Sequence, residues 1–217
     1  ATDPETSWNY EAGLRFDRGL LSFEAIGFLN AYDNLLGTCT ASTGGGCTIG
    51  DQFSGGRVEV RGLEVTTGWD AGPALGWHLG VPLSLVYTLS DGSFQSSFNS
   101  GYEPWGNVQS GDELPYLPRH QLALNAGLDA GTWRVNATVN HVSEVRAMAG
   151  SGAIPAGQRV EARTLLDLAA EVELTPSTAL FATVQNATDD VYNVGFAPAG
   201  ARPGAPRLIM AGLRFAF

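Results

Sequence analysis

Strict alternation of apolar and polar side chains constrains this chain more than any other feature. In the last eleven residues, RLIMAGLRFAF (207–217), Ile209, Ala211, Leu213, Phe215 and Phe217 all share one parity. A period of two residues places successive side chains on opposite faces of a β-strand. The stretch is therefore predicted to be a strand whose apolar face runs to its last residue and must be covered by something else.

The same period predicts nine strands. We expect them at about 8–16, 21–30, 57–69, 77–89, 122–128, 133–140, 166–174, 180–186 and 208–217. Pro82 lies inside the fourth strand and cannot donate a ladder hydrogen bond, so it marks a bulge or moves the start of the strand beyond it. Short turns alternate with long loops, and the long loops are expected at about 37–56, 94–119, 147–160 and 187–206.

This layout favours a membrane barrel. Short turns at one end and long loops at the other are typical of outer-membrane β-barrels, and a strand of about ten residues crosses a bilayer when tilted. Aromatic residues gather at the strand ends, as in interfacial girdles. A soluble β-sandwich also shows alternation, but its strands are usually about five or six residues long. We therefore expect an all-β, transmembrane antiparallel β-barrel, with a soluble β-sandwich binding module as one alternative.

Charge and motifs exclude several functions. The formal net charge is −10, and all twelve cations are arginine, which argues against a nucleic-acid partner because phosphates need neutralising cations. GxSxG, P-loop, HExxH and GxGxxG motifs do not occur. His78, His120 and His141 fall on different segments, so the sequence predicts no metal site. We expect neither an enzyme nor a cofactor.

The two cysteines lie close together in a glycine-rich stretch. Cys39 and Cys47 belong to GTCTASTGGGCTIG. Two thiols cannot complete a four-ligand zinc site. A short disulfide staple, formed in an oxidising compartment, is the favoured interpretation, and a pair of free thiols is the alternative.

Several segments together resemble a known family. They are PETSWNYEAGLRFD (4–17), RGLEV (61–65), GDELPYLPRHQL (111–122), LLDLAAEVEL (165–174), QNATDDVY (185–192) and PAGARPGAPR (198–207), followed by a strand that ends at Phe217. In this order and spacing they resemble the C-terminal barrel portion of TonB-dependent outer-membrane receptors, most closely the ferric-dicitrate type. The resemblance covers essentially the whole chain.

The resemblance implies a barrel of about 22 strands, preceded by a plug domain and a TonB box. Residues 1–217 would form about the last nine strands, with the plug domain absent. The implied function is energy-coupled uptake of a ferric chelate, ferric citrate or another siderophore, at the bacterial outer membrane. The TonB complex would act through the missing N-terminal region. The terminal strand, with Leu213, Phe215 and Phe217, would close the barrel and be read by the barrel assembly machinery. A self-standing small barrel, acting as a pore or adhesin, is the remaining alternative.

Arginines beside the long loops are the candidate binding residues for an anionic chelate. They are Arg57, Arg61, Arg119, Arg146, Arg159, Arg163, Arg202 and Arg207. The planar guanidinium can bond both oxygens of a carboxylate. We expect Arg119 and Arg163 to contribute most, followed by Arg57 and Arg146, because these lie where loops meet strands. The alternative is that each pairs with a nearby acidic side chain. The iron would stay inside its chelator, so no direct metal ligand is expected.

Overall fold

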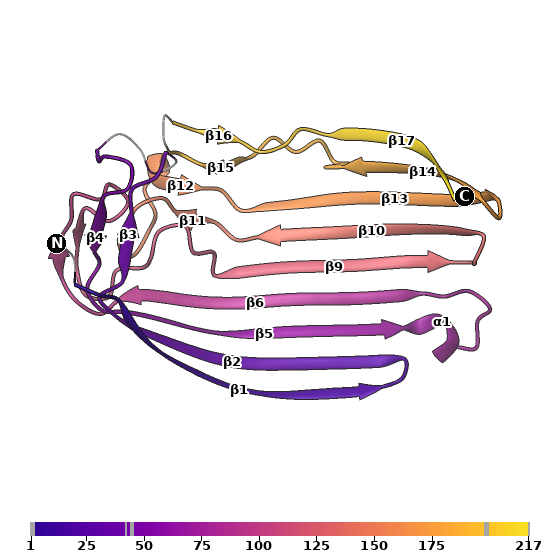
Figure 1. Ribbon diagram of the computed structural model, residues 1–217, viewed down its shortest axis with the longest axis horizontal. Coiled ribbons are helices and arrows are strands. Elements are labelled where there is room, and N and C mark those ends of the chain that lie inside the picture. The colour runs from indigo at the N-terminus through magenta and orange to yellow at the C-terminus, as the bar shows by residue number, and fades with distance from the viewer. Residues whose placement is uncertain (1–2, 42, 44–45, 198–199, 217) are drawn as a thin grey trace.

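The computed structural model describes residues 3–41, 43, 46–197 and 200–216, and its main element is one nine-stranded antiparallel sheet (Figure 1). Its strands, in sheet order, are β1 (Thr6–Arg18), β2 (Leu21–Asp33), β5 (Val58–Asp70), β6 (Pro82–Phe94), β9 (His120–Asp129), β10 (Trp133–Val142), β13 (Arg163–Thr175), β14 (Thr178–Gln185) and β17 (Leu208–Phe215). Among these nine strands, each pairs with the ones before and after it along the chain, as expected of a meander. The prediction of nine strands is confirmed.

Connections at the two ends of the sheet differ in length, as the sequence predicts. Four loops lie at the end drawn on the left of Figure 1, and we call them the first (34–57), second (95–119), third (143–162) and fourth (186–207) loops. Each contains one short strand pair: β3 (Leu36–Thr38) with β4 (Gln52–Ser54), β7 (Phe98–Asn99) with β8 (Asn107–Val108), β11 (Val145–Arg146) with β12 (Arg159–Val160), and β15 (Asn193–Gly195) with β16 (Arg202–Pro203). The third loop also holds the 3-10 turn η1 (Ala156–Gln158).

The opposite end carries the turns. Between β5 and β6 the turn contains the short helix α1 (Ala71–Ala74). The fourth predicted strand begins at Pro82, so Trp77 precedes it. The strand thus starts later than its alternation suggests, with the proline as its first residue and not before it. In the described part of the chain, no helix is long and apolar enough to cross a membrane.

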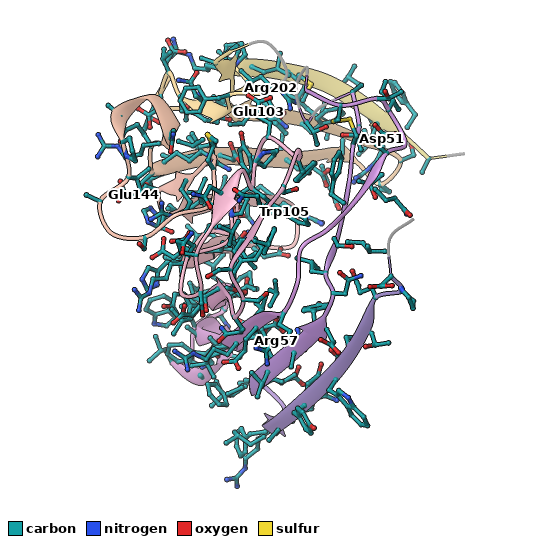
Figure 2. The ribbon with its side chains drawn as sticks, turned by 90° about the vertical axis from the view of Figure 1, so that its left-hand side faces the viewer. Asp51, Arg57, Glu103, Trp105, Glu144 and Arg202 are labelled. Carbon is teal, nitrogen blue, oxygen red and sulfur yellow. A yellow bond between two sulfur atoms is a disulfide. The ribbon has the colours of Figure 1, made fainter. Side chains whose placement is uncertain are left out.

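The sheet curves into an open arc, seen from the loop end in Figure 2. β1 and β17 are its two edges, and within the described residues they pair with β2 and β14 and not with each other. The result is part of a barrel wall. No second large sheet packs against it in the described ranges, so the β-sandwich alternative is wrong.

Packing distinguishes the two faces of the sheet. Val58 and Val60 of β5 contact a hydrophobic cluster around Trp105, which lies inside the arc (Figure 2). The even-numbered side chains of β5 therefore face the concave side. Because paired residues of neighbouring strands point to the same face, the strand register assigns a face to each residue of all nine strands. Arg214 belongs to the concave face, whereas Leu213 and Phe215 belong to the convex face. Phe217 lies outside the described residues.

The convex face carries an apolar band with polar pairs near the loop end. Exposed large apolar side chains lie along it, among them Leu63, Leu124, Leu168, Leu180 and Leu213. Nearer the loops on the same face, the Tyr87 hydroxyl lies 2.8 Å from His120 Nδ1, and His141 Nδ1 lies 2.8 Å from Thr164 Oγ1. A contiguous exposed apolar surface of this kind marks an interaction with lipid or protein.

Candidate functional site

A hydrophobic core joins the first and second loops inside the arc. Trp105 of the second loop is only 5% exposed, and its neighbours Phe94, Val58 and Val108 are fully buried. The Trp105 ring meets Phe94 and Tyr102 edge-on, with centroids 5.8 and 4.9 Å apart. Edge-to-face contacts of this kind add to the energy of burial. The core fixes the shape of the loop end.

Two glycines of the first loop make room for the tryptophan. A β-carbon on Gly37 or Gly55 would lie 2.8 or 2.6 Å from Trp105 Cη2, closer than real side chains approach. The indole can therefore lie directly on the backbone beside β3 and β4. This contact fixes the first loop to the second.

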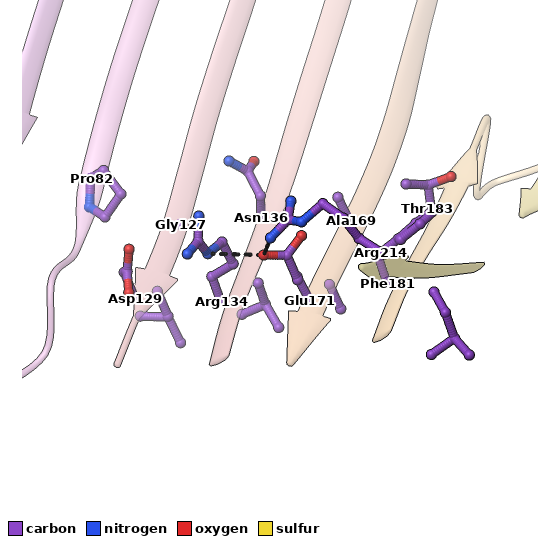
Figure 3. Close-up of a pocket in the computed structure, with 14 residues that line it drawn as sticks. Pro82, Gly127, Asp129, Arg134, Asn136, Ala169, Glu171, Phe181, Thr183 and Arg214 are labelled. Atoms are coloured by element: carbon purple, nitrogen blue, oxygen red, sulfur yellow. Dashed lines mark hydrogen bonds and ion pairs between the residues drawn. The ribbon is translucent and has the colours of Figure 1, made fainter. Parts of the chain in front are cut away.

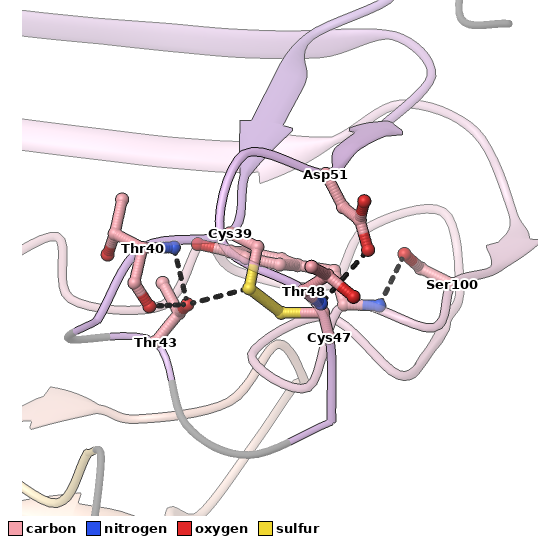
Figure 4. Close-up of a disulfide and its surroundings, with 8 residues drawn as sticks. Cys39, Thr40, Thr43, Cys47, Thr48, Asp51 and Ser100 are labelled. Carbon is pink, nitrogen blue, oxygen red and sulfur yellow. Dashed lines mark hydrogen bonds between the residues drawn. A yellow bond between two sulfur atoms is a disulfide. The ribbon is translucent and has the colours of Figure 1, made fainter.

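A disulfide closes the outer part of the first loop (Figure 4). Cys39 and Cys47 are bonded, which confirms the favoured interpretation of the pair. The Thr48 N–H donates to Asp51 Oδ2 at 2.9 Å, and the Cys39 N–H donates to the Asp51 carbonyl at 2.8 Å. Cys47 and Thr48 are thus tied to the residues beside the β3–β4 hairpin by covalent and hydrogen bonds.

Three loops enclose a cavity of about 570 Å³, which we call the mouth cavity. Its wall consists of Leu35, Leu36, Gly37, Thr38 and Thr43 from the first loop, Tyr102, Pro104, Trp105, Leu114, Pro115, Tyr116 and Leu117 from the second, and Val194, Gly195, Ala197 and Arg202 from the fourth. Its size falls within the roughly 300–1,000 Å³ of ligand-binding pockets. The first and fourth loops, far apart in sequence, therefore line one cavity at the loop end.

The polar side chains in the described wall of the mouth cavity are two threonines, two tyrosines and one arginine. Tyr116 adopts a left-handed backbone conformation with φ of 58°, and its hydroxyl accepts a hydrogen bond of 3.4 Å from the Phe196 N–H. Burial raises the pKa of Tyr102, and the neighbouring Tyr116 adds to this shift. Arg202 is the charged residue of the described wall. Aromatic faces with a guanidinium suit a flat ligand that carries acidic oxygens.

Two of the predicted arginines line a second cavity, of about 340 Å³, between the second and third loops. Arg146 is 4% exposed there, and its Nε donates to Glu113 Oε2 at 2.8 Å. Its Nη2 also donates to the Gly152 carbonyl at 3.0 Å. Arg119 lines the same cavity and is exposed. Arg146 is therefore engaged with its own loops, whereas Arg119 is accessible.

The other two predicted arginines lie elsewhere. The Arg163 guanidinium is 5.7 Å from the centroid of the Tyr192 ring, a cation–π geometry. Arg57 is exposed, and its backbone N–H donates to Ser96 Oγ at 3.0 Å. Neither residue lines the cavity that holds Arg119 and Arg146. Within the described ranges, no group of three or more potential metal ligands is present.

Charged side chains also meet on the concave face near the turns (Figure 3). Glu171 Oε1 accepts a hydrogen bond from Arg214 Nη2 at 2.8 Å and lies 3.7 Å from Arg134 Nε. With Asp129 and Asn136 these groups line a third cavity, of about 610 Å³. Ionic and amide groups on this face, opposite the apolar band, are typical of a barrel with a polar interior.

The family was identified by comparison with known proteins. A family model described as "TonB dependent receptor-like, beta-barrel" matches residues 2–187. The chain belongs to this family of TonB-dependent receptor β-barrels. Its curved sheet, long loops at one end and polar concave face are thus parts of a receptor barrel.

Solved structures of receptors share the fold. The ferric-catecholate import receptor Fiu from E. coli K12 matches with a TM-score of 0.72 at 18% identity, over 100% of this chain and 28% of that one. The ferric citrate transporter FecA gives 0.71 at 21% identity, over 97% of this chain and 31% of that one. The ferric yersiniabactin uptake receptor FyuA from Yersinia pestis gives 0.72 at 16% identity, over 98% and 30%.

This chain therefore spans less than a third of the length of these receptors. A search of curated proteins found no match. The similarity to the solved structures shows the architecture of the receptor wall. It does not identify the ligand of this chain.

Sequence reasoning missed most of the mouth cavity. Arg202 was one of eight loop arginines with nothing to distinguish it, and Trp105 and Tyr116 lay in a loop without periodicity. The motif GDELPYLPRHQL (111–122) did contain a signal, because it places Tyr116 between two prolines that stiffen the chain. A constrained aromatic in a loop is a reasonable candidate for a binding residue.

Proposed function

We propose that this chain forms the C-terminal part of a bacterial outer-membrane receptor that takes up a ferric chelate, ferric citrate or another siderophore. Family membership supports the receptor class, and the related structures named above import ferric chelates. The observation that carries the proposal is the mouth cavity at the loop end of the wall. A receptor needs a ligand site on the side from which the ligand arrives.

The two faces of the sheet support the placement in a membrane. The convex face presents leucines to the lipid, and the concave face presents Arg134, Glu171 and Arg214 to the interior. The Tyr87–His120 and His141–Thr164 pairs would lie at the outer boundary, where polar aromatic side chains are favoured. The long loops then face the exterior and the turns face the periplasm.

The mouth cavity is the proposed site of capture, with Arg202 as the carboxylate-binding or catecholate-binding cation. Arg119, Arg163 and Arg57 are proposed as secondary contacts that attract the anion, because their guanidinium groups lie at the loop end. Arg146 has a different proposed role, since Glu113 and Gly152 already occupy its donors. It would hold the second and third loops together.

Energy coupling and assembly complete the proposal. Energy would come from the TonB complex through a plug domain, and the terminal strand, with Leu213, Phe215 and Phe217, would be read by the barrel assembly machinery. These assignments follow the family and complete the proposal.

Binding to the full-length receptor in detergent tests the proposed capture site. Ferric citrate, a ferric catecholate and the same chelators without iron are titrated while tryptophan fluorescence is followed, because Trp105 lines the cavity. Arg202→Gln should weaken the binding of a ferric chelate about tenfold, because it removes about one hydrogen bond to a charged group. Arg207→Gln is the matched control, since Arg207 belongs to the same loop and pairs with Asp189 outside the cavity.

Two results would overturn the proposal. One is equal weakening by Arg202→Gln and Arg207→Gln, which would remove the mouth cavity as the site. The other is uptake of radiolabelled iron that continues after the proton gradient has been collapsed. That result would favour the alternative of a passive pore.

A further inference from the structure

One turn on the periplasmic side is unlike the others. The connections 19–20, 130–132 and 176–177 contain two or three residues, whereas the connection between β5 and β6 spans 71–81 and includes α1 (Figure 1). Antiparallel strands need only a two-residue link. The extra residues therefore need a reason other than joining the strands.

The base of this turn is held by several hydrogen bonds. Asp70 Oδ1 accepts from the Gly72 N–H at 3.3 Å and from the Val81 N–H at 2.9 Å. Gly80 and Asp129 of the neighbouring strand exchange two backbone hydrogen bonds, of 2.8 and 2.9 Å. Gly72 packs against the Leu79 carbonyl with no room for a β-carbon. The turn therefore has a defined shape.

Its tip is apolar and uncovered. Leu75 is 56% exposed and Trp77 is 54% exposed, and residues 71–77 carry no charge. Burial of a large apolar side chain is favourable. A tryptophan that stays exposed to water does not gain this free energy. The neighbouring strand ends also expose large apolar groups on the convex face, where Leu21 and Trp69 are register partners. The tip and this apolar part of the convex face thus lie at the same end of the sheet.

We propose that Leu75 and Trp77 form a fixed anchor that inserts into the headgroup region of the periplasmic lipid leaflet. The proposal rests on the membrane placement argued above. Tryptophan suits this position because its ring is apolar and its indole N–H can reach water or headgroups. A rigid base makes the anchor effective, because little conformational freedom is lost when the tip inserts.

Spin labels can locate the tip in the full-length receptor, reconstituted in nanodiscs of phosphatidylethanolamine and phosphatidylglycerol. Leu75→Cys and Trp77→Cys provide labelling sites, and the two native cysteines of this chain are bonded to each other. Ser177→Cys is the matched control, an exposed position on the two-residue turn Pro176–Ser177, which carries neither leucine nor tryptophan. Ala170→Cys on the convex face reports whether the wall itself meets lipid.

Collision rates with oxygen, which partitions into lipid, and with a water-soluble nickel chelate decide between the outcomes. We expect labels at 75 and 77 to favour oxygen several-fold relative to the label at 177. Equal values at 77 and 177 would place the tip in water and overturn the anchor. Protection from both reagents would mean that protein covers the tip, which also overturns it. A label at 170 that avoids oxygen would instead contradict the membrane placement.

Discussion

Asp167 Oδ1 accepts a hydrogen bond of 2.8 Å from the backbone N–H of Asn186, at the point where β14 ends. Asn186 is 3% exposed and has a left-handed backbone, with φ of 48°. Its side chain bonds the backbone of Asp190 through both Oδ1 and Nδ2, and that of Ala205 through Nδ2. One asparagine thus starts the fourth loop, which supplies Arg202 to the mouth cavity.

Replacement of Asn186 should loosen the fourth loop. Asn186→Gly keeps the backbone conformation and loses the side-chain bonds, at a cost of about 1–3 kcal/mol. Asn186→Ala should cost about 1 kcal/mol more, because a β-carbon disfavours the left-handed region. Hydrogen exchange of residues 186–207 measures both values. If alanine and glycine cost the same, the backbone conformation contributes nothing.

The fit of Trp105 against Gly37 predicts strong coupling between the first two loops. Gly37→Ala should destabilise them by about 1–3 kcal/mol through overpacking, because the atoms nearest to its β-carbon would all belong to the indole of Trp105. Trp105→Leu should remove most of this penalty, so that the double variant is less unstable than additivity requires. Thermal unfolding of the four proteins of the cycle tests the coupling. Additive effects would show that the contact is not formed.

Alternation of side chains explains why the wall could be predicted and the loops could not. In β17 the parity of Leu213 and Arg214 alone assigns the convex and concave faces, since a strand offers only two. The contact between Trp105 and Gly37 joins two loops 68 positions apart in the sequence, and no local pattern encodes it. The alternation of Trp77, Leu79 and Val81 predicts a strand where the structure has the second half of the turn after β5. Asp70 and the close packing of Gly72 hold that segment in another shape.

The disulfide should stabilise the first loop against opening. Serine at both Cys39 and Cys47 removes a crosslink that closes a short segment, and the chain-entropy estimate for such a segment is about 2–3 kcal/mol. Hydrogen exchange at Cys39 and Gly50, whose N–H groups bond across the segment, should rise accordingly. Exchange in the fourth loop is the internal control. Unchanged protection at both amides would show that the hydrogen bonds alone hold the segment.

Arg146 is predicted to act on loop structure and not on the ligand. Arg146→Met should lower the stability of the contact between the second and third loops by about 1–3 kcal/mol, because Glu113 and the Gly152 carbonyl lose a charged donor. Glu113→Gln should have a smaller effect, since the amide oxygen still accepts the Nε–H hydrogen bond. Limited proteolysis of residues 143–162 measures the opening. A loss of ligand affinity without faster cleavage would assign Arg146 to the binding site instead.

Tyr102 gives the mouth cavity a dependence on alkaline pH. Burial raises its pKa above the ordinary value of 10.0, because a phenolate is poorly solvated there. The folded loops therefore bind this proton more tightly than the unfolded chain does. The stabilisation is complete below pH 10 and is lost as the pH rises through the folded pKa. Tyr102→Phe should remove this part of the pH dependence while preserving the ring contact with Trp105. Ligand affinity and phenolate absorbance are measured from pH 8 to about pH 12. In the wild type, affinity should fall over the pH range in which absorbance rises. An identical affinity profile for the phenylalanine variant would contradict the assignment.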